Sequence, residues 1–255
     1  MRKYLLVFLS VLLISFIVSS SYLGYLLYQR SENKIGVIKI EGMIATSDAP
    51  ANSLEIANLL EKAREDDGIK AIIIRIDSPG GTPAAIQDII REIYKTKKKK
   101  PVIVSMGDIA TSGAYIISCA GDWIFAEPGT LTGGLGAIIV LEDRSEKYEK
   151  EGVKFHVIKS TDYKDLGADY RPPKNEELEL LTELVNDIND QMISTIAENR
   201  NMDIEEVRKI ADGTLFTGET AKNLGLVDDL GNMNDAIEHA KEITGIKKEN
   251  VVYLK

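Results

Sequence analysis

Short apolar runs and amphipathic segments alternate along the chain after residue 34. Residues 35–42 (IGVIKIEG) alternate β-branched and polar side chains, which is typical of a strand. Residues 53–66 and 83–97 carry apolar side chains at helical spacing. Residues 69–77 and 101–107 are nearly continuous apolar runs, as in strands buried on both faces of a parallel sheet. This order of strands and helices predicts an α/β layered domain with right-handed crossovers.

The same pattern predicts further elements downstream. We expect Ser53 to cap its helix, strands at 122–126 and 154–158, and a helix at 144–151. A long amphipathic helix is predicted at 175–199, and the C-terminal third indicates short helices and glycine turns. The apolar stripe of the long helix comprises Leu178, Leu181, Val185, Ile188, Met192 and Ile196.

The N-terminus has a different pattern, because residues 4–28 contain no charged residue. A helix of this length would measure about 37 Å, enough to cross a hydrocarbon core of about 30 Å. A cleaved signal peptide ending near residues 19–21 is the alternative, but the apolar character continues beyond those serines. We therefore expect residues 1–30 to be a cytoplasmic start and a transmembrane anchor. Arg2 and Lys3 on the near side place residues 31–255 outside the cytoplasm, as one extracytoplasmic domain.

Charge and cysteine content narrow the function classes. The formal net charge is −9, and the charged residues of the first 30 positions are all basic, so the rest of the chain is still more acidic. Such a surface repels phosphates and argues against a nucleic-acid partner. The single cysteine, Cys119, excludes an internal disulfide and is expected to be a small buried side chain.

Candidate bases and metal ligands are few. The two histidines, His156 and His239, are expected to be structural, and no HExxH motif, cysteine pair or His–carboxylate cluster is present. We expect no metal and no cofactor. Lysine becomes the alternative base, although it must be kept neutral by desolvation. The segment 157–167 (VIKSTDYKDLG) offers Lys159 and Lys164, which its local sequence also allows to be ordinary solvated lysines.

Two glycine-containing segments follow the buried strands. In DSPGG (residues 77–81), Gly80 and Gly81 allow the backbone N–H groups to face a ligand, either as half of an oxyanion hole or as a platform for an extended peptide. In ATSGAY, Ser112 is either an ordinary helix cap or a nucleophile at a helix N-terminus.

The ordered set DSPGG, ATSGAY and KSTDYKD, followed by IADGTLFTGETAKNLGLVDDLG, resembles the signal peptide peptidase A family of serine proteases from about residue 35 to 231. The resemblance implies a layered fold similar to the Clp protease and crotonase superfamily. It also implies a Ser/Lys dyad with Ser112 as nucleophile and Lys164 as general base, while Lys159 falls outside the matching position. The N–H groups of Gly113 and Gly81 match the oxyanion donors, with Gly80 beside them.

The function expected from this resemblance is a membrane-anchored endopeptidase that cleaves remnant signal peptides or other apolar, membrane-derived peptides. The family forms ring-like homo-oligomers, and dyad residues can come from adjacent protomers. The residue beside the base, Asp165, must then point away from Lys164, because a nearby carboxylate would keep the amine charged. Three alternatives are a stomatin-type membrane-protein protease, an acyl-CoA enzyme of the crotonase fold and a non-catalytic membrane scaffold.

Overall fold

The computed structural model describes residue 9 and residues 12–24, 33–247 and 250–255. Within these residues an eight-stranded sheet has the order β10-β1-β4-β5-β6-β9, and every neighbouring pair along this path is parallel. A short strand, β7, continues the sheet beside the end of β5 and pairs antiparallel with β8. The bounds are β1 (Lys34–Glu41), β4 (Ile69–Ser78), β5 (Val102–Thr111), β6 (Trp123–Ala126), β7 (Leu131–Gly133), β8 (Leu215–Thr217), β9 (Asp229–Leu230) and β10 (Val251–Tyr253).

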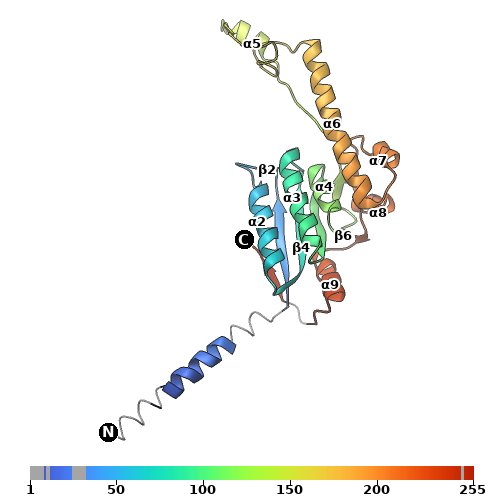
Figure 1. The fold of residues 1–255 in the computed structure, drawn as a ribbon. Coiled ribbons are helices and arrows are strands. Elements are labelled where there is room, and N and C mark those ends of the chain that lie inside the picture. The colour runs from blue at the N-terminus through green and yellow to red at the C-terminus, as the bar shows by residue number, and fades with distance from the viewer. Residues whose placement is uncertain (1–8, 10–11, 25–32, 248–249) are drawn as a thin grey trace.

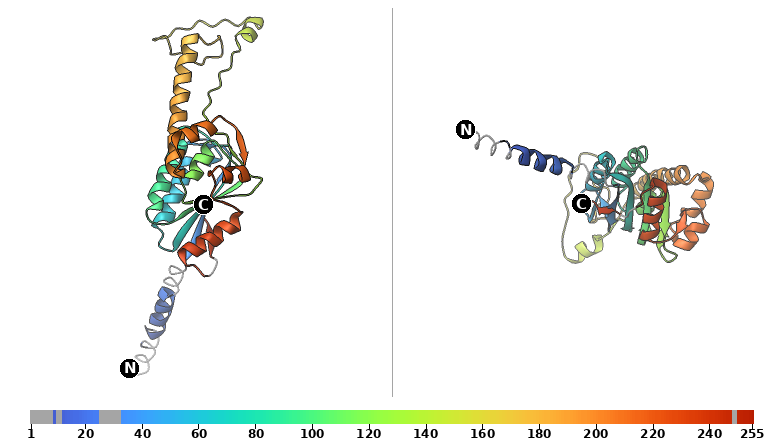
Figure 2. Two further views of the ribbon diagram at one scale, coloured as in Figure 1. Left: turned by 90° about the vertical axis from the view of Figure 1, so that its right-hand side faces the viewer. Right: turned by 90° about the horizontal axis from the view of Figure 1, so that it is seen from below.

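Helices cover both faces of this sheet, which makes the expected layered α/β fold (Figures 1 and 2). One face carries α2 (Ser53–Glu65), α3 (Pro83–Lys97), α4 (Gly113–Cys119), α6 (Asn175–Arg200), α7 (Ile204–Ile210) and α8 (Gly218–Asn223). The other face carries α9 (Met233–Thr244). The continuous apolar run of β4 serves both layers, since Ile72 and Ile74 join the first core and Ile73 joins the second. The predicted burial of this strand on both faces is confirmed.

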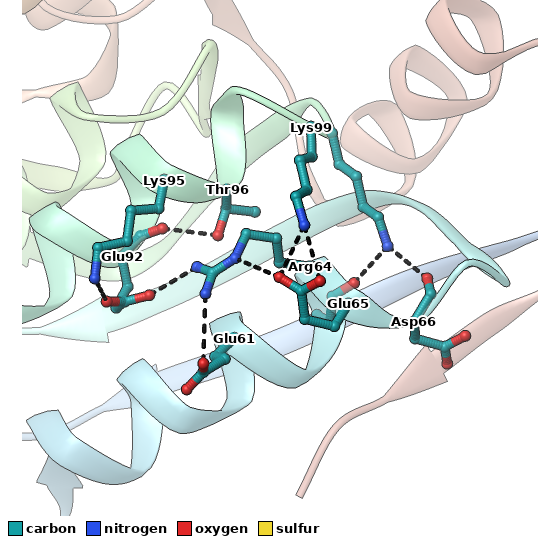
Figure 3. A network of polar contacts seen from close by, with 10 residues as sticks. Glu61, Arg64, Glu65, Asp66, Glu92, Lys95, Thr96 and Lys99 are labelled. Atoms are coloured by element: carbon teal, nitrogen blue, oxygen red, sulfur yellow. Dashed lines mark hydrogen bonds and ion pairs between the residues drawn. The ribbon is translucent and has the colours of Figure 1, made fainter.

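The two helices α2 and α3 are joined at one end by a network of ion pairs (Figure 3). The guanidinium of Arg64, on a side chain only 10% exposed, donates to Glu92 at 2.7 Å and to Glu65 at 3.1 Å. Glu65 also pairs with Lys99 at 2.8 Å, and the amine of Lys100 donates to the Ala63 carbonyl at 2.7 Å. The cationic residues that follow α3 therefore satisfy acceptors at the C-terminal end of α2.

Two sequence-based predictions of local structure are wrong. Ser53 is the first residue of α2, and its cap is Asn52, whose side-chain oxygen accepts from the N–H groups of Leu54 and Glu55. The expected strand at 154–158 is an irregular segment. Its residues have strand-like composition, but within the described residues no strand pairs with them, so the ladder hydrogen bonds of a sheet are missing.

Residues 139–184, which we call the arm, project from the body of the molecule (Figures 1 and 2). The arm contains α5 (Ser145–Lys150), the segment that follows it and the N-terminal half of α6. The first half of the predicted apolar stripe on α6 is half-buried or exposed, with Leu178 at 44%, whereas Met192 and Ile196 in the second half are buried against the body.

The predicted anchor at 1–30 lies partly outside the described residues. Of that segment, residues 12–24 are helical and exposed. No helix in the part of the chain that the structure describes is both long enough and apolar enough to cross a membrane. The anchor stays a prediction.

Candidate active site

The carboxyl ends of two neighbouring parallel strands form the candidate site. β4 leads into Pro79, Gly80 and Gly81, and β5 leads into Ser112, with Ser78 opposite Ala110 in the register. The hydroxyl of Thr111 donates to the Pro79 carbonyl at 3.1 Å and joins the two turns. The fold thus brings the DSPGG and ATSGAY segments together, because parallel strands end at the same edge of a sheet.

Ser112 adopts a backbone conformation that side-chain-bearing residues seldom use, with φ 53° and ψ −125°. Its own N–H donates to the Gly133 carbonyl at 2.8 Å, and its carbonyl accepts from Ile116 N–H. Its hydroxyl makes no capping hydrogen bond to α4, although the residue occupies the N-cap position. An ordinary cap would use that oxygen on the helix. With the backbone in this conformation, the hydroxyl has no hydrogen-bond partner among the described residues.

Two backbone N–H groups lie beside Ser112. Gly81 forms a parallel bridge with Ile44, in which Ile44 N–H donates to Gly80 and Thr82 N–H donates to Ile44, both at 2.9 Å. The N–H of Gly81 is therefore directed away from Ile44. The N–H of Gly113 opens α4, where the first helical amides have no intrahelical acceptor.

The packing of these three glycines leaves no room for side chains. A Cβ on Gly81 would lie 1.9 Å from the Ile44 carbonyl oxygen, and one on Gly113 would lie 2.0 Å from Cδ1 of Ile86 and 3.3 Å from the Gly81 nitrogen. Gly80 has φ 107°, and its Cβ would lie 2.9 Å from the Gly113 nitrogen. Backbone atoms exclude a side chain at Gly80 and Gly81, whereas at Gly113 the obstacle is the end of the Ile86 side chain.

A pocket of about 160 Å³ opens beside Ser112, Gly81 and Gly113. It lies between α3, α4 and α6, and across it Gln87 on α3 donates to Gln191 on α6 at 3.1 Å. The sequence pattern places Ile188 and Met192 only in a helical stripe, and a stripe does not reveal which helix it faces. The apolar lining is Pro83, Ile86, Ile90, Ile116, Ala137, Ile138, Ile188 and Met192.

Lys164 lies elsewhere. It is exposed, it belongs to the arm, and it is not among the residues that line the pocket. Its neighbour Asp165 accepts hydrogen bonds from Lys159, Tyr170 and Arg171, so that carboxylate is engaged by other side chains of the arm. The described chain brings Ser112, Gly80, Gly81 and Gly113 together and leaves Lys164 apart from them.

The remaining candidates have structural surroundings. The ring of His239 packs against Trp123 and Phe125, with centroids 4.8 and 5.6 Å away, and His156 is exposed on the arm. Cys119 is buried beside α6, and burial raises the pKa of its thiol to about 12. Among the described residues no three His, Cys, Asp or Glu side chains are grouped to hold a metal ion.

Comparisons with known proteins relate this chain to a family of peptidases. The family model of peptidase family S49 matches residues 94–247. A putative protease of Synechocystis sp. is 37% identical over 87% of this chain and 78% of its own length. A putative signal peptide peptidase SppA of Enterococcus faecium is 33% identical over 88% of this chain and 68% of its own length.

A putative protease of Methanocaldococcus jannaschii is 34% identical over 76% of this chain, which spans 63% of that relative. Among solved structures, a mutant form of the membrane-bound stomatin-specific protease 1510-N shares the fold, with a TM-score of 0.56 and 17% identity over 88% of this chain and 98% of its own. The chain belongs to peptidase family S49, the signal peptide peptidase A family that its motifs resemble.

Proposed function

We propose that this chain is a membrane-anchored serine endopeptidase that uses a Ser/Lys dyad. One observation carries the proposal. Ser112 has φ 53° and a hydroxyl that makes no capping hydrogen bond, and the N–H groups of Gly81 and Gly113 and an apolar pocket lie beside it. Ser112 acts as the nucleophile, and the two N–H groups stabilise the oxyanion of the tetrahedral intermediate. Such donors contribute about 10²–10³ in rate each.

The general base of this proposal is Lys164, supplied by the arm of a neighbouring copy. Its neutral amine takes the proton from Ser112 and returns it to the leaving amine. Within one chain the lysine is exposed and away from the pocket, so it must be desolvated by the surface of another copy before it can serve as a base.

The proposed substrates are remnant signal peptides and other apolar peptides released at a membrane. The pocket beside Ser112 is lined largely by aliphatic side chains, which suits small or medium apolar residues. One edge of the DSPGG segment is already paired with Ile44, so an extended peptide would add along the opposite edge. The proposed anchor within residues 1–30 would hold the site near such peptides, with the catalytic domain outside the cytoplasm.

Labelling with a fluorophosphonate, which phosphonylates activated serines with loss of fluoride, tests the site directly. We expect peptide mapping to find one adduct, on Ser112, that is lost in Lys164→Met. Cleavage of a quenched apolar peptide should fall to background in Ser112→Ala and in Lys164→Met. His156→Ala, a change in the same arm, should leave most of the turnover. Near-normal turnover of the Lys164 variant would remove the dyad assignment, and full turnover of Ser112→Ala would remove the nucleophile.

A further inference from the structure

The loop that carries Lys164 is tied down by its next residue. The Asp165 carboxylate, 11% exposed, accepts from Lys159 Nζ at 2.6 Å and from the Tyr170 hydroxyl at 2.9 Å. It also accepts from Arg171 Nε at 3.1 Å and from Arg171 Nη2 at 3.0 Å. Three side chains therefore share one carboxylate, and no ion pair or hydrogen bond among the described residues involves the Lys164 amine.

Arg171 extends this contact to the start of α6. Its Nη1 and Nη2 donate to the two carboxylate oxygens of Glu177, at 2.8 and 2.6 Å. Glu177 is only 1% exposed, and it also accepts the Lys174 N–H at 2.9 Å. A fork of two parallel hydrogen bonds to a carboxylate fixes both direction and distance.

The surroundings make this network unusual in the arm. Nearby apolar side chains are exposed, including Ile158 at 99% and Tyr163 at 53%, yet a carboxylate has been enclosed. A buried carboxylate is stable only when it is paired and hydrogen-bonded, so the arginine must stay where it is. The planar guanidinium can serve both acids at once, which a lysine ammonium cannot do with the same geometry.

We propose that Arg171 is a positioning residue for the general base: it holds the Asp165 carboxylate away from the Lys164 amine and fixes the Lys164 loop on the first turn of α6. The proposal rests on the proposed role of Lys164. Without Arg171 the carboxylate keeps Lys159 and Tyr170 as donors but loses both guanidinium hydrogen bonds. Because Asp165 follows Lys164 directly, a carboxylate loosened in this way could turn to the amine and favour its protonated form. A lysine held in that form cannot accept the serine proton.

The test compares pH–rate profiles of the full-length chain. In Arg171→Met we expect the acid limb of kcat/KM to move to higher pH by about one unit, since an opposite charge at 4–6 Å shifts a lysine equilibrium by this order. At pH values on the acid side of the limb, a shift of this size lowers kcat/KM about tenfold. Arg171→Lys, which keeps one cation, should give a smaller shift. The double variant Asp165→Asn/Arg171→Met should return the limb to its wild-type position, because the carboxylate is gone.

A second readout does not need turnover. Competitive acetylation of Lys164 across a pH series, followed by peptide mapping, reports how much of the amine is neutral. Its midpoint should move in the same direction in Arg171→Met and return in the double variant. Arg208→Met removes an exposed arginine of α7 that pairs with Asp190 of α6 at 2.7 Å, and should change neither readout.

The outcomes separate the two proposals. If Lys164→Met is inactive but the Arg171 variants keep wild-type profiles and acetylation midpoints, the positioning role is refuted and the dyad stands. If Lys164→Met is active, the dyad is refuted, and acetylation alone decides whether Arg171 controls Asp165. A limb that moves in Arg171→Met and does not return in the double variant also refutes the role, because a general loss of packing would then explain the shift.

Discussion

The residue that follows Ser112, Gly113, has no free space for a side chain. A Cβ on Gly113 would lie 2.0 Å from Cδ1 and 2.8 Å from Cγ1 of Ile86. Both atoms belong to a side chain, so the collision can be relieved only if Ile86 moves or is shortened. We expect Gly113→Ala to lower the free energy of unfolding by about 1–3 kcal/mol, as overpacking does, and to lower kcat/KM.

The matched variant shortens the partner. Ile86→Ala alone should also destabilise, but urea unfolding of Ile86→Ala/Gly113→Ala should show a loss smaller than the sum of the singles by about 1 kcal/mol. Gly129, which has open space around its Cβ position, provides the control, and Gly129→Ala should be tolerated. Additive losses at residues 86 and 113 would show that the close approach does not matter in solution.

For single residues, the sequence indicates which residues belong to the candidate site better than it indicates their backbone geometry. Gly80, Gly81, Ser112 and Gly113 could be singled out because they follow two buried strands that end at one edge of a sheet. The φ of 53° at Ser112 could not be predicted from local sequence. The Ser112 N–H donates to the carbonyl of Gly133, which lies in β7, about twenty residues later in the chain. Local sequence also placed Ser53 as a cap, since Asn52 and Ser53 are both good cap residues and only the backbone decides between them.

Among the elements, the start of α6 is held by a carboxylate and should therefore respond to acid. Arg171 lowers the pKa of Glu177 to about 2, helped by the Lys174 N–H, and it also lowers the pKa of Asp165. A lowered pKa in the folded state means that the carboxylate stabilises the arm above its unfolded pKa of about 4.3. That contribution is lost as the pH falls from there towards about 2.

Hydrogen exchange, corrected for the intrinsic pH dependence of the amides, measures this local stability. Protection in the first turns of α6 should fall with acid while protection near Ile193, buried against the body, persists. Glu177→Gln should be less protected at neutral pH and should lose the acid dependence. Glu176→Gln, at the exposed neighbouring position, should behave as wild type. Equal acid sensitivity along the whole of α6 would contradict a local role for the network.

The type of an element could be predicted where the apolar side chains of its pattern are buried. It could not be predicted where such side chains are exposed. β4 is buried on both faces, and its continuous apolar run predicted this correctly. Residues 154–158 have equally strand-like side chains, but Phe155 is 46% and Ile158 is 99% exposed, and no strand of the described chain pairs with them. A pattern records which side chains are apolar. It does not record whether the surface that would cover them belongs to the same chain.

The two residues of the proposed dyad lie in different parts of the molecule. Ser112 lines a pocket on the body, whereas Lys164 is exposed on an arm whose apolar side chains are also exposed, including Leu178 at 44% and Leu184 at 47%. An exposed apolar surface of this kind is typical of an interface. A second copy that covers the arm would both bury these side chains and bring a lysine to a serine.

Subunit mixing tests this arrangement with two inactive chains. If each site takes its serine from one copy and its lysine from the next, equimolar Ser112→Ala and Lys164→Met chains, reassembled together, should recover about a quarter of wild-type turnover, because random neighbours complement one time in four. Wild type mixed equally with the double variant should also give about a quarter for a shared site, but half for a site within one chain. No recovery in the first mixture together with half in the second would place both residues in one subunit, and the arm would then have to fold back on its own body.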